Sequence, residues 1–340
     1  MPKKPRERPG RLSVTLADVA REIRMSEITV SRVIRNKGAI SSETRERVEA
    51  AIRKVGYVPN RLAGSLASSG SNLIGVIVPT LRSIFPEILQ GINDAISPKG
   101  YRAVVGSTEF KQREEERLVT ALLSWRPAAM IVAAFDHSPT TTEQLSAARH
   151  NLVEITDIER EPIGVAIGIS HWQAGYQTAQ YLIGRGYRRF GYVGHNIKDD
   201  RYALRRRAGF LQALTEAGLA FVGEKIVNKP YNFALGRSAL AGLLANGAKP
   251  DVVYFSNDNM AVGGYFHCLA AGIAVPGQLA LAGFNGVDLG QALPTPLTSV
   301  LSSRYDLGKL AGRSALALID GRPVPKVTDV GFTLIEGGTA

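Results

Sequence analysis

Residues 27–35 carry side chains that can read a DNA sequence. Arg32 can donate two hydrogen bonds to guanine, and Ile28 can contact the methyl group of thymine. Glu27 can accept a hydrogen bond from cytosine N4, although its carboxylate repels phosphate. Nearby groups that can bond a phosphate or a base edge are the hydroxyls of Thr29 and Ser31 and the cations Arg35, Lys37, Arg45 and Arg47.

Three predicted helices position these side chains. Thr15 can cap a first helix over residues 16–23. Ser26 can cap a second helix over residues 27–35, and a third helix covers residues 42–55. Apolar residues recur at helical spacing along one side of each helix. Three short helices with a tight turn between the first two are typical of a helix-turn-helix unit, although any small helical domain shows such stripes.

The positive charge of the chain is concentrated at its start. The net charge is +11, and residues 1–70 hold 15 of the 41 Lys and Arg but only 7 of the 30 Asp and Glu. A basic segment on a nearly neutral body indicates an anionic polymer as partner, and a solvated tail is the alternative. We expect a basic flexible tail over residues 1–13 and the helix-turn-helix domain over 14–58. A linker over 59–71 and a large body over 72–340 follow.

The large body alternates strand and helix patterns. The apolar runs that read as buried strands are 73–78, 101–105, 128–133, 152–155, 189–193, 252–255 and 279–282. This alternation predicts a doubly wound α/β architecture, and its length favours two similar lobes with a cleft. The first crossing between the lobes is expected within residues 151–170. In open α/β sheets a ligand lies beyond the carboxyl ends of the strands.

Polar side chains lie at such positions. Arg82 and Asp157 follow two of the predicted strands, Asp258 follows a third, and Arg206 stands near the start of a predicted helix. Carboxylate and amide groups suit sugar hydroxyls, whereas arginine suits a carboxylate or a phosphate. Tyr231 can stack on a sugar ring. These residue types therefore indicate a site for a sugar or a sugar acid.

Several runs of residues match a known family in order and spacing. They are residues 14–20, 29–33, 44–48 and 56–61, with 329–334 and 337–338 near the end. Together they closely resemble the lactose-repressor (LacI/GalR) family of transcriptional regulators, and the last two resemble its gluconate-repressor branch. The likeness covers the rest of the chain and implies a two-lobed, periplasmic-binding-protein-like domain after the helix-turn-helix domain.

The resemblance implies further DNA contacts in the linker. It implies a hinge helix that pairs across a dimer and wedges Leu66 into the minor groove, with Ala63 one turn before it and Asn60 near its start. So short a helix, interrupted by Gly64, is marginal in isolation, so we expect it to be ordered only by binding. A plain interdomain linker is the alternative.

The resemblance also implies ligand-binding residues in the cleft. Arg206 matches the arginine of the family's Arg-x-x-Gly-aromatic motif, and Asp258 matches the aspartate of its Asn-Asp-x-Met-Ala motif. Asp157 and Phe85 match pocket positions, and Arg304 falls in the segment that crosses back between the lobes. Capping of a turn is the alternative role for Asp157, and core packing is the alternative for Phe85.

The chain departs from the family pattern at two places. The family usually has glycine in the helix-turn-helix turn, where this chain has Arg24, and a non-glycine residue takes the left-handed conformation at a cost of about 1 kcal/mol. Arg24 is a candidate phosphate contact, with plain solvation as the alternative, and Thr15 is a further candidate DNA contact. The family often has Asp-Asn where this chain has Ser170-His171, which weakens the transfer of ligand contacts there.

Motifs for catalysis or for a cofactor are not found in the sequence. It has no phosphate-binding loop, no nucleophile elbow and no close pair of histidines at metal spacing, so we expect no enzyme, no cofactor and no metal. Each of the five histidines is expected to be structural or exposed. The single cysteine, Cys268, excludes an intrachain disulfide and suits a reducing cytosol. No apolar run approaches the roughly 18 residues of a membrane span, and the basic N-terminus lacks the apolar part of a secretory signal.

These observations predict a transcriptional repressor. We expect it to bind double-stranded operator DNA as a homodimer, with its affinity controlled by a sugar or sugar acid bound between the lobes. If Arg82, Arg206 and Arg304 all face the cleft, they favour a carboxylate-bearing effector such as gluconate. The alternative is a cytosolic sugar-binding protein or a sugar-processing enzyme, since the α/β body alone permits both.

Overall fold

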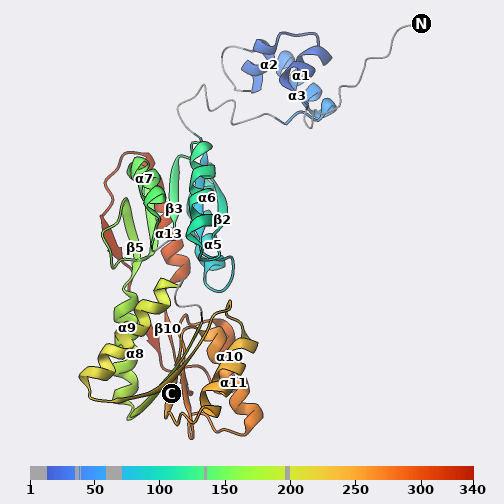
Figure 1. Cartoon of the computed structure of the whole chain (residues 1–340). Helices are drawn as coiled ribbons and strands as arrows, with labels where there is room; N and C mark the ends of the chain where they lie inside the picture. Colours follow the sequence, from blue (N-terminus) through green and yellow to red (C-terminus); the bar gives the residue numbers. More distant parts are fainter. Residues whose placement is uncertain (1–13, 35–37, 39, 59–70, 134–135, 196–199) are drawn as a thin grey trace. The chain divides into compact units, whose positions relative to one another are not determined.

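The computed structural model describes residues 14–34, 38, 40–58, 71–133, 136–195 and 200–340 (Figure 1). The chain forms two compact units, which divide after Gly70. Within these ranges, we find no helix with the length and apolar character that a membrane span requires.

In the described part of the smaller unit, three helices pack around one core. They are α1 (Leu16–Glu22), α2 (Glu27–Ile34) and α3 (Ser42–Val55). The fully buried apolar side chains come from all three helices: Val19, Ala20, Val30, Val33, Val48 and Ala51. The predicted helices and their apolar stripes are confirmed, although α1 ends one residue earlier than predicted.

Side-chain caps mark where α1 and α2 begin, and a glycine marks where α3 ends. The backbone N–H and the hydroxyl of Thr15 donate to the Asp18 carboxylate at 2.9 and 2.6 Å, and these bonds lower the pKa of Asp18 to about 2. Ser26 Oγ accepts the backbone N–H of Thr29 at 3.1 Å at the start of α2. α3 ends at Gly56, whose φ of 68° is the left-handed conformation that glycine adopts without strain.

The larger unit has two lobes, each built on a parallel sheet. The sheet of the first lobe has the strand order β11-β5-β4-β3-β1-β2. Its strands are β1 (Leu73–Val78), β2 (Arg102–Ser107), β3 (Ala129–Val132), β4 (Leu152–Asp157), β5 (Val165–Ile169) and β11 (Val327–Asp329). Ile74, Val76 and Val78 pack on one face, and Ile77 packs on the other. Burial on both faces explains why β1 is a continuous apolar run.

Helices cover both faces of this sheet. Those on one face are α5 (Phe85–Ile96) and α13 (Arg304–Ile319), and those on the other are α6 (Gln112–Ser124) and α7 (Pro139–Ala147). α13 is therefore a late segment of the chain that returns to the first lobe and packs beside α5 (Figure 1). Two short 3₁₀ turns complete the lobe, η1 (Ser97–Lys99) and η2 (Arg149–Asn151).

The second lobe repeats this architecture with four strands. Its order is β7-β6-β8-β9, from β6 (Arg189–His195), β7 (Ala220–Val227), β8 (Val252–Phe255) and β9 (Ala280–Ala282). One face is covered by α8 (His171–Gly184) and α9 (Arg201–Glu216), and the other by α10 (Phe233–Ala245) and α11 (Asp258–Ala271). A short helix, α12 (Asp288–Gln291), follows β9. The predicted doubly wound, two-lobed architecture is confirmed.

Three connections join the lobes. The chain passes from β5 to α8 at Ser170, from β10 (Ser299–Leu301) to α13, and from β11 to β12 (Thr333–Ile335). β10 and β12 pair antiparallel, beside a cluster of Ile169, Ala174, Phe284 and Val300. The first crossing lies at the end of the predicted stretch, because that stretch also contains β5, which the sequence interpretation omitted. The other omitted strands are β7 and the short β10, β11 and β12.

Candidate functional site

The outer side of α2 presents most of the predicted DNA-reading residues. Glu27, Ile28 and Arg32 are exposed, and Ile28 has 69% of its surface accessible to solvent. Thr29 and Ser31 are half-buried on the same helix. A helix that buries one stripe and exposes an arginine, a carboxylate and a large apolar group has the side chains that base edges in the major groove require.

The turn that precedes α2 contains Arg24 in a left-handed conformation. Its φ is 53°. The backbone N–H of Arg24 donates to Arg21 O at 3.3 Å, and that of Met25 donates to Ala20 O at 3.0 Å. These two bonds are the Schellman pattern that commonly ends a helix with glycine. The chain therefore keeps the turn geometry with an exposed arginine in the glycine position.

Several other predicted DNA contacts are committed to caps or lie outside the described ranges. The hydroxyl of Thr15 donates to Asp18, and that of Thr29 lies 2.9 Å from the Ser26 hydroxyl. Both hydroxyls therefore make their hydrogen bonds at the start of their own helix. The predicted contacts that lie outside the described residues are Arg35, Lys37, Asn60, Ala63 and Leu66.

A pocket lies between the two lobes of the larger unit, at the carboxyl ends of several strands. It contains about 470 Å³ of open space, counting the part that is open to solvent. Its aromatic wall is formed by Phe85, Phe110, Tyr202, Tyr231 and Phe284. The polar residues that line it are Ser83, Thr156, His171, His195, Asp200, Arg206, Asn257 and Asn285. Apolar rings with a few convergent polar groups are typical of a site for a small molecule.

Arg206 brings a buried cation into this pocket. It lies in α9, has only 5% of its surface exposed, and its guanidinium carbon is 3.9 Å from the centre of the Phe284 ring. Nη1 donates to His171 Nδ1 at 3.0 Å, and Nη2 donates to the carbonyl oxygen of Ser256 at 3.1 Å. Nε has no hydrogen-bond partner among the described residues. A buried guanidinium whose hydrogen-bond partners are all uncharged favours a ligand that carries a negative charge.

His171 is a pocket residue, contrary to expectation. Arginine only donates hydrogen bonds, so Nδ1 of His171 is the acceptor from Arg206. Its Nε2 lies 3.1 Å from the carbonyl oxygen of Thr156, which only accepts, so the ring proton is on Nε2. Burial, together with the charge of Arg206, lowers the pKa of His171 well below its ordinary value. The ring is therefore neutral at physiological pH.

His195 is a second lining residue that was expected to be structural or exposed. Its Nδ1 lies 3.0 Å from Ser256 Oγ, and its Nε2 lies 3.5 Å from Asp200 Oδ2. Burial lowers the pKa of His195 despite the nearby Asp200. The sequence held one signal for both histidines, since His195 ends a strand and His171 follows one at the ligand-binding edge of a sheet.

Both parts of the chain match known protein families. Residues 15–60 match the model of bacterial regulatory proteins of the lacI family, and residues 179–340 match that of a periplasmic binding protein-like domain. The HTH-type transcriptional regulator GntR of Escherichia coli strain K12 is 32% identical over 326 residues, which are 95% of this chain and 98% of that protein. The chain belongs to the LacI family.

Solved structures of LacI-family proteins share its fold. A LacI-family transcriptional regulator from Silicibacter pomeroyi is 38% identical with a TM-score of 0.90, over 96% of this chain and 99% of that one. The Lac repressor dimer bound to operator and the anti-inducer ONPF is 24% identical with a TM-score of 0.78, over 96% and 99% of the two chains, and shows the fold alone. This LacI-family protein is a DNA-binding transcriptional regulator, and not an enzyme.

Asp258 and Asp157 of this LacI-family regulator lie beside the pocket and are not among its lining residues. Asp258 accepts the Ser299 hydroxyl at 2.7 Å and the backbone N–H of Val287 at 2.8 Å. Asp157 accepts the backbone N–H of Glu159 at 2.9 Å, as a turn cap does. Burial raises the pKa of each aspartate to about 6. In this arrangement both carboxylates therefore support the backbone that shapes the pocket.

The three arginines that were expected to face the cleft are placed differently. Arg206 lines the pocket, whereas Arg82 is largely exposed and pairs with Glu109 at 3.2 Å. Arg304 is buried, pairs with Glu87 at 3.0 Å and donates to the carbonyl oxygen of Asn285. The condition that all three face the cleft is therefore not met in this LacI-family protein. Phe85 and Tyr231 are among the lining residues, and Phe85 also packs in the core of the first lobe, which was its alternative role.

Proposed function

We propose that this regulator is a repressor that binds a pseudo-palindromic operator as a homodimer and releases it when a sugar acid such as gluconate fills the pocket. The observation that carries the effector class is the burial of Arg206 among neutral hydrogen-bond partners, with Nε unpaired. A carboxylate gives such a guanidinium a charge-assisted bond that a neutral sugar does not. Hydroxyl groups of the same ligand would find acceptors and donors in Asn257, Asn285 and Asp200.

Recognition of the operator rests on α2. Arg32 would read guanine and Ile28 a thymine methyl from the exposed side of the helix. Arg24, Arg35 and the cations of α3 would bind phosphates, which strengthens binding without adding sequence preference. In the linker, Leu66 with Ala63 and Asn60 would enter the minor groove, as the family resemblance implies.

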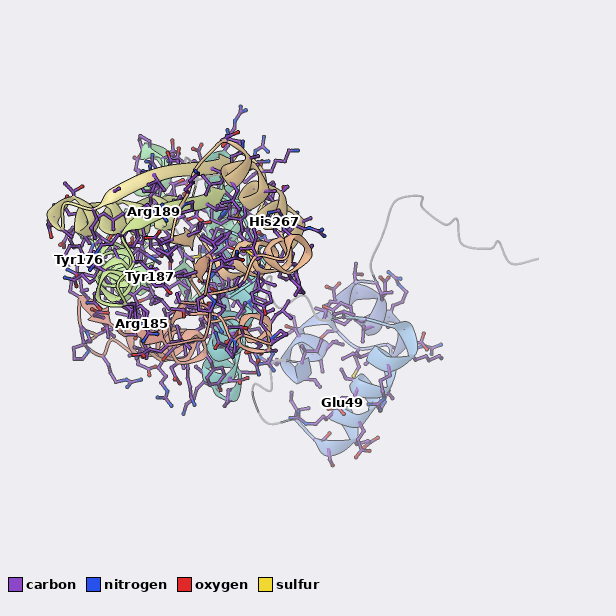
Figure 2. The ribbon with its side chains drawn as sticks, turned by 90° about the horizontal axis from the view of Figure 1, so that it is seen from below. Glu49, Tyr176, Arg185, Tyr187, Arg189 and His267 are labelled. Carbon is purple, nitrogen blue, oxygen red and sulfur yellow. The ribbon has the colours of Figure 1, made fainter. Side chains whose placement is uncertain are left out.

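A homodimer is supported by an apolar exposed side of α11. Phe266 and Leu269 have 41% and 67% of their surfaces exposed and stand on successive turns of the helix. His267, labelled in Figure 2, belongs to the same helix. Exposed apolar groups that adjoin one another commonly mark an association surface. Two copies related by a two-fold axis would place two copies of α2 on the two halves of an operator.

Effector control follows from a pocket that both lobes line. A ligand that contacts both lobes binds one lobe arrangement more tightly than another, and it shifts the population toward that arrangement. The lobe arrangement would set the spacing of the two hinge segments in the dimer and so the affinity for DNA. Because a transcriptional regulator acts on DNA inside the cell, we propose a cytoplasmic location for this protein.

The test combines operator selection with effector titration. The full chain is used to select sequences from a random duplex library, and a pseudo-palindromic consensus is expected. Mobility shift with that consensus should show at least about a tenfold loss of affinity for Arg32→Ala and no change for Arg322→Ala, an exposed arginine after α13. Gluconate should release the complex at lower concentration than glucose. Enrichment of no sequence, or release by glucose alone, would contradict the proposal.

A further inference from the structure

We propose that His171 is the positioning residue that holds Arg206 in the pocket while leaving its positive charge uncompensated, and that it thereby sets the preference for acidic over neutral ligands. The inference rests on the proposed effector class and goes beyond it, because it names the group that creates the preference. Its basis is the chain of hydrogen bonds from Thr156 through His171 to Arg206.

The guanidinium of Arg206 is held on three sides. The His171 ring accepts from Nη1, the Ser256 carbonyl accepts from Nη2, and the Phe284 ring stacks against the guanidinium plane. Of these contacts, the bond to His171 is the one made to a side-chain acceptor. Loss of that acceptor would leave a buried N–H group unpaired and free the side chain to change rotamer.

The partners of Arg206 are all uncharged. Within the described ranges no carboxylate lies at ion-pair distance from it, and Asp200, which also lines the pocket, is turned toward Ala203 N–H at 3.0 Å and His195. A neutral imidazole therefore does what a carboxylate at this place would also do, which is to accept from Nη1, but it does so without cancelling the charge. The charge remains available to a ligand.

A hydrogen bond from His171 also links the second lobe to Thr156, a residue of the first lobe with a strained backbone. Its Nε2–H donates to the carbonyl oxygen of Thr156, whose φ of 83° is rare for a β-branched residue. Strained backbone persists where surrounding contacts hold it and is common at ligand sites. The bond therefore fixes Arg206 relative to the wall of the pocket that β4 provides, and not only to its own helix.

The test uses two nearly isosteric variants that differ in charge. Asparagine and aspartate side chains can both place an oxygen near the position of the His171 Nδ1 atom. His171→Asn therefore keeps a neutral acceptor, and His171→Asp keeps an acceptor with a negative charge. His171→Leu removes the acceptor. Calorimetric titration of the full-length protein with gluconate and with glucose gives the ratio of the two affinities for each variant.

The charge that each variant places beside Arg206 determines the expected ratio of gluconate to glucose affinity. His171→Asn should keep the wild-type ratio within about threefold, and His171→Asp should lower it by about tenfold or more, because its carboxylate pairs with Arg206. His171→Leu should weaken gluconate binding by about tenfold. Equal ratios for the asparagine and aspartate variants would overturn the proposal. His150→Asn, which replaces an exposed histidine of η2 in the first lobe, is the matched control and should keep the wild-type ratio.

A ligand-free measurement separates this inference from the proposed function. Nitrogen-15 NMR of the wild-type protein should show His171 neutral with its proton on Nε2, and a charged ring at pH 7 would overturn the assigned role. If the wild-type protein prefers glucose, the proposed effector class is wrong. The role of His171 is then still decided by the NMR result and by the ranking of the three His171 variants in their affinity for whichever ligand the wild-type protein binds.

Discussion

Nε of Arg201 lies 2.7 Å from Oδ2 of Asp136, so an ion pair joins the first turn of α9 in the second lobe to the loop after β3 in the first. Arg201 directly follows Asp200, a lining residue of the pocket. A second pair joins the lobes one turn further along α9, where Arg205 lies 2.8 Å from Glu159. In this arrangement of the lobes, in which both lobes line the pocket, both ion pairs are formed.

We expect Asp136→Asn to weaken effector binding. Both side chains of the Asp136–Arg201 pair are about half exposed, so its contribution is that of a surface ion pair, about 0.5–1 kcal/mol or a two- to fivefold change in affinity. Calorimetry at low ionic strength should show this loss, and the difference from wild type should shrink as salt screens the pair.

A charge exchange provides the control. The double variant Asp136→Arg with Arg201→Asp should recover most of the lost affinity. Asp320→Asn, which breaks the Asp320–Arg322 pair at the end of α13 without touching the second lobe, should leave effector binding unchanged. A loss in Asp136→Asn that persists at high salt would show that the ion pair is not its cause.

Replacement of Arg24 separates backbone strain from charge. Arg24→Gly should raise the free energy of unfolding of the three-helix unit by up to about 1 kcal/mol, because glycine takes the left-handed conformation without a Cβ clash. Hydrogen exchange of the α1 and α3 amides in the full chain measures this change. Arg24→Ala removes the charge and keeps the strain, so it should not stabilise the unit.

The two Arg24 variants should behave alike on DNA. If the exposed guanidinium contacts a phosphate, both lower the slope of log affinity against log salt by about 0.9. An unchanged slope in both variants would show that the guanidinium of Arg24 is solvated and does not contact a phosphate. If the slope changed in Arg24→Gly but not in Arg24→Ala, the conformation of the turn would be the cause of the change.

The helix-turn-helix unit was predictable because its signals are local. Thr15 and Ser26 bond groups three residues away, and the core side chains recur at the spacing of a single helix. Even the left-handed Arg24 follows from a motif a few residues long. Burial on both faces makes a continuous apolar run of β1, which was found, although β5 is equally buried and apolar and was omitted.

The composition of the pocket was not predictable to the same degree. Arg206 was found by its motif, but its partners His171 and Ser256 lie on other elements, and no sequence pattern indicates the bonds between them. Asp258 belongs to a family motif, yet the partners that hold its carboxylate, Ser299 and Val287, are distant in the chain. The direction of a side chain at a site depends on such long-range contacts, and the spacing of apolar residues along the sequence does not predict them.

A buried charge cluster should make the stability of the first lobe depend on pH. His137 Nδ1 lies 2.9 Å from Glu115 Oε1, and its Nε2 faces Glu154 and Arg160. Burial and the nearby charge of Arg160, whose Nη2 lies 3.1 Å from Nε2, disfavour the charged ring, but the hydrogen bond to Glu115 and the carboxylate of Glu154, 3.8 Å from Nε2, outweigh them and raise the pKa of His137. The folded protein therefore favours the protonated ring. Its contribution is fully present below the ordinary histidine pKa of about 6.5 and is lost as pH rises through the raised value.

The variant His137→Gln isolates this contribution. Urea unfolding of the full chain, followed by the fluorescence of Trp125 and Trp172, gives the difference in free energy between wild type and variant. We expect wild type to be more stable by about 1–3 kcal/mol below pH 6.5 and the difference to shrink at higher pH. A difference that grows with pH would contradict the assignment. Glu115→Gln should weaken the same pH dependence.

Close packing of α8 on α9 should control the position of Arg206. A Cβ atom at Gly175 would overlap the carbonyl oxygen of Arg206, and one at Gly209 would overlap that of Trp172. Gly175→Ala therefore forces the two helices apart at the point where His171 and Arg206 meet. We expect a loss of about 1–3 kcal/mol in the free energy of unfolding and a weaker affinity for the effector.

The matched control lies on the same helix. Gly184, the last residue of α8, has no neighbour within 4 Å of an added Cβ. Gly184→Ala should therefore be neutral or stabilise the protein by up to about 1 kcal/mol, since alanine favours helix more than glycine. Calorimetric melting and effector titration of both variants measure the contrast. If Gly175→Ala kept both stability and effector affinity, the close approach of α8 and α9 would not be what positions Arg206.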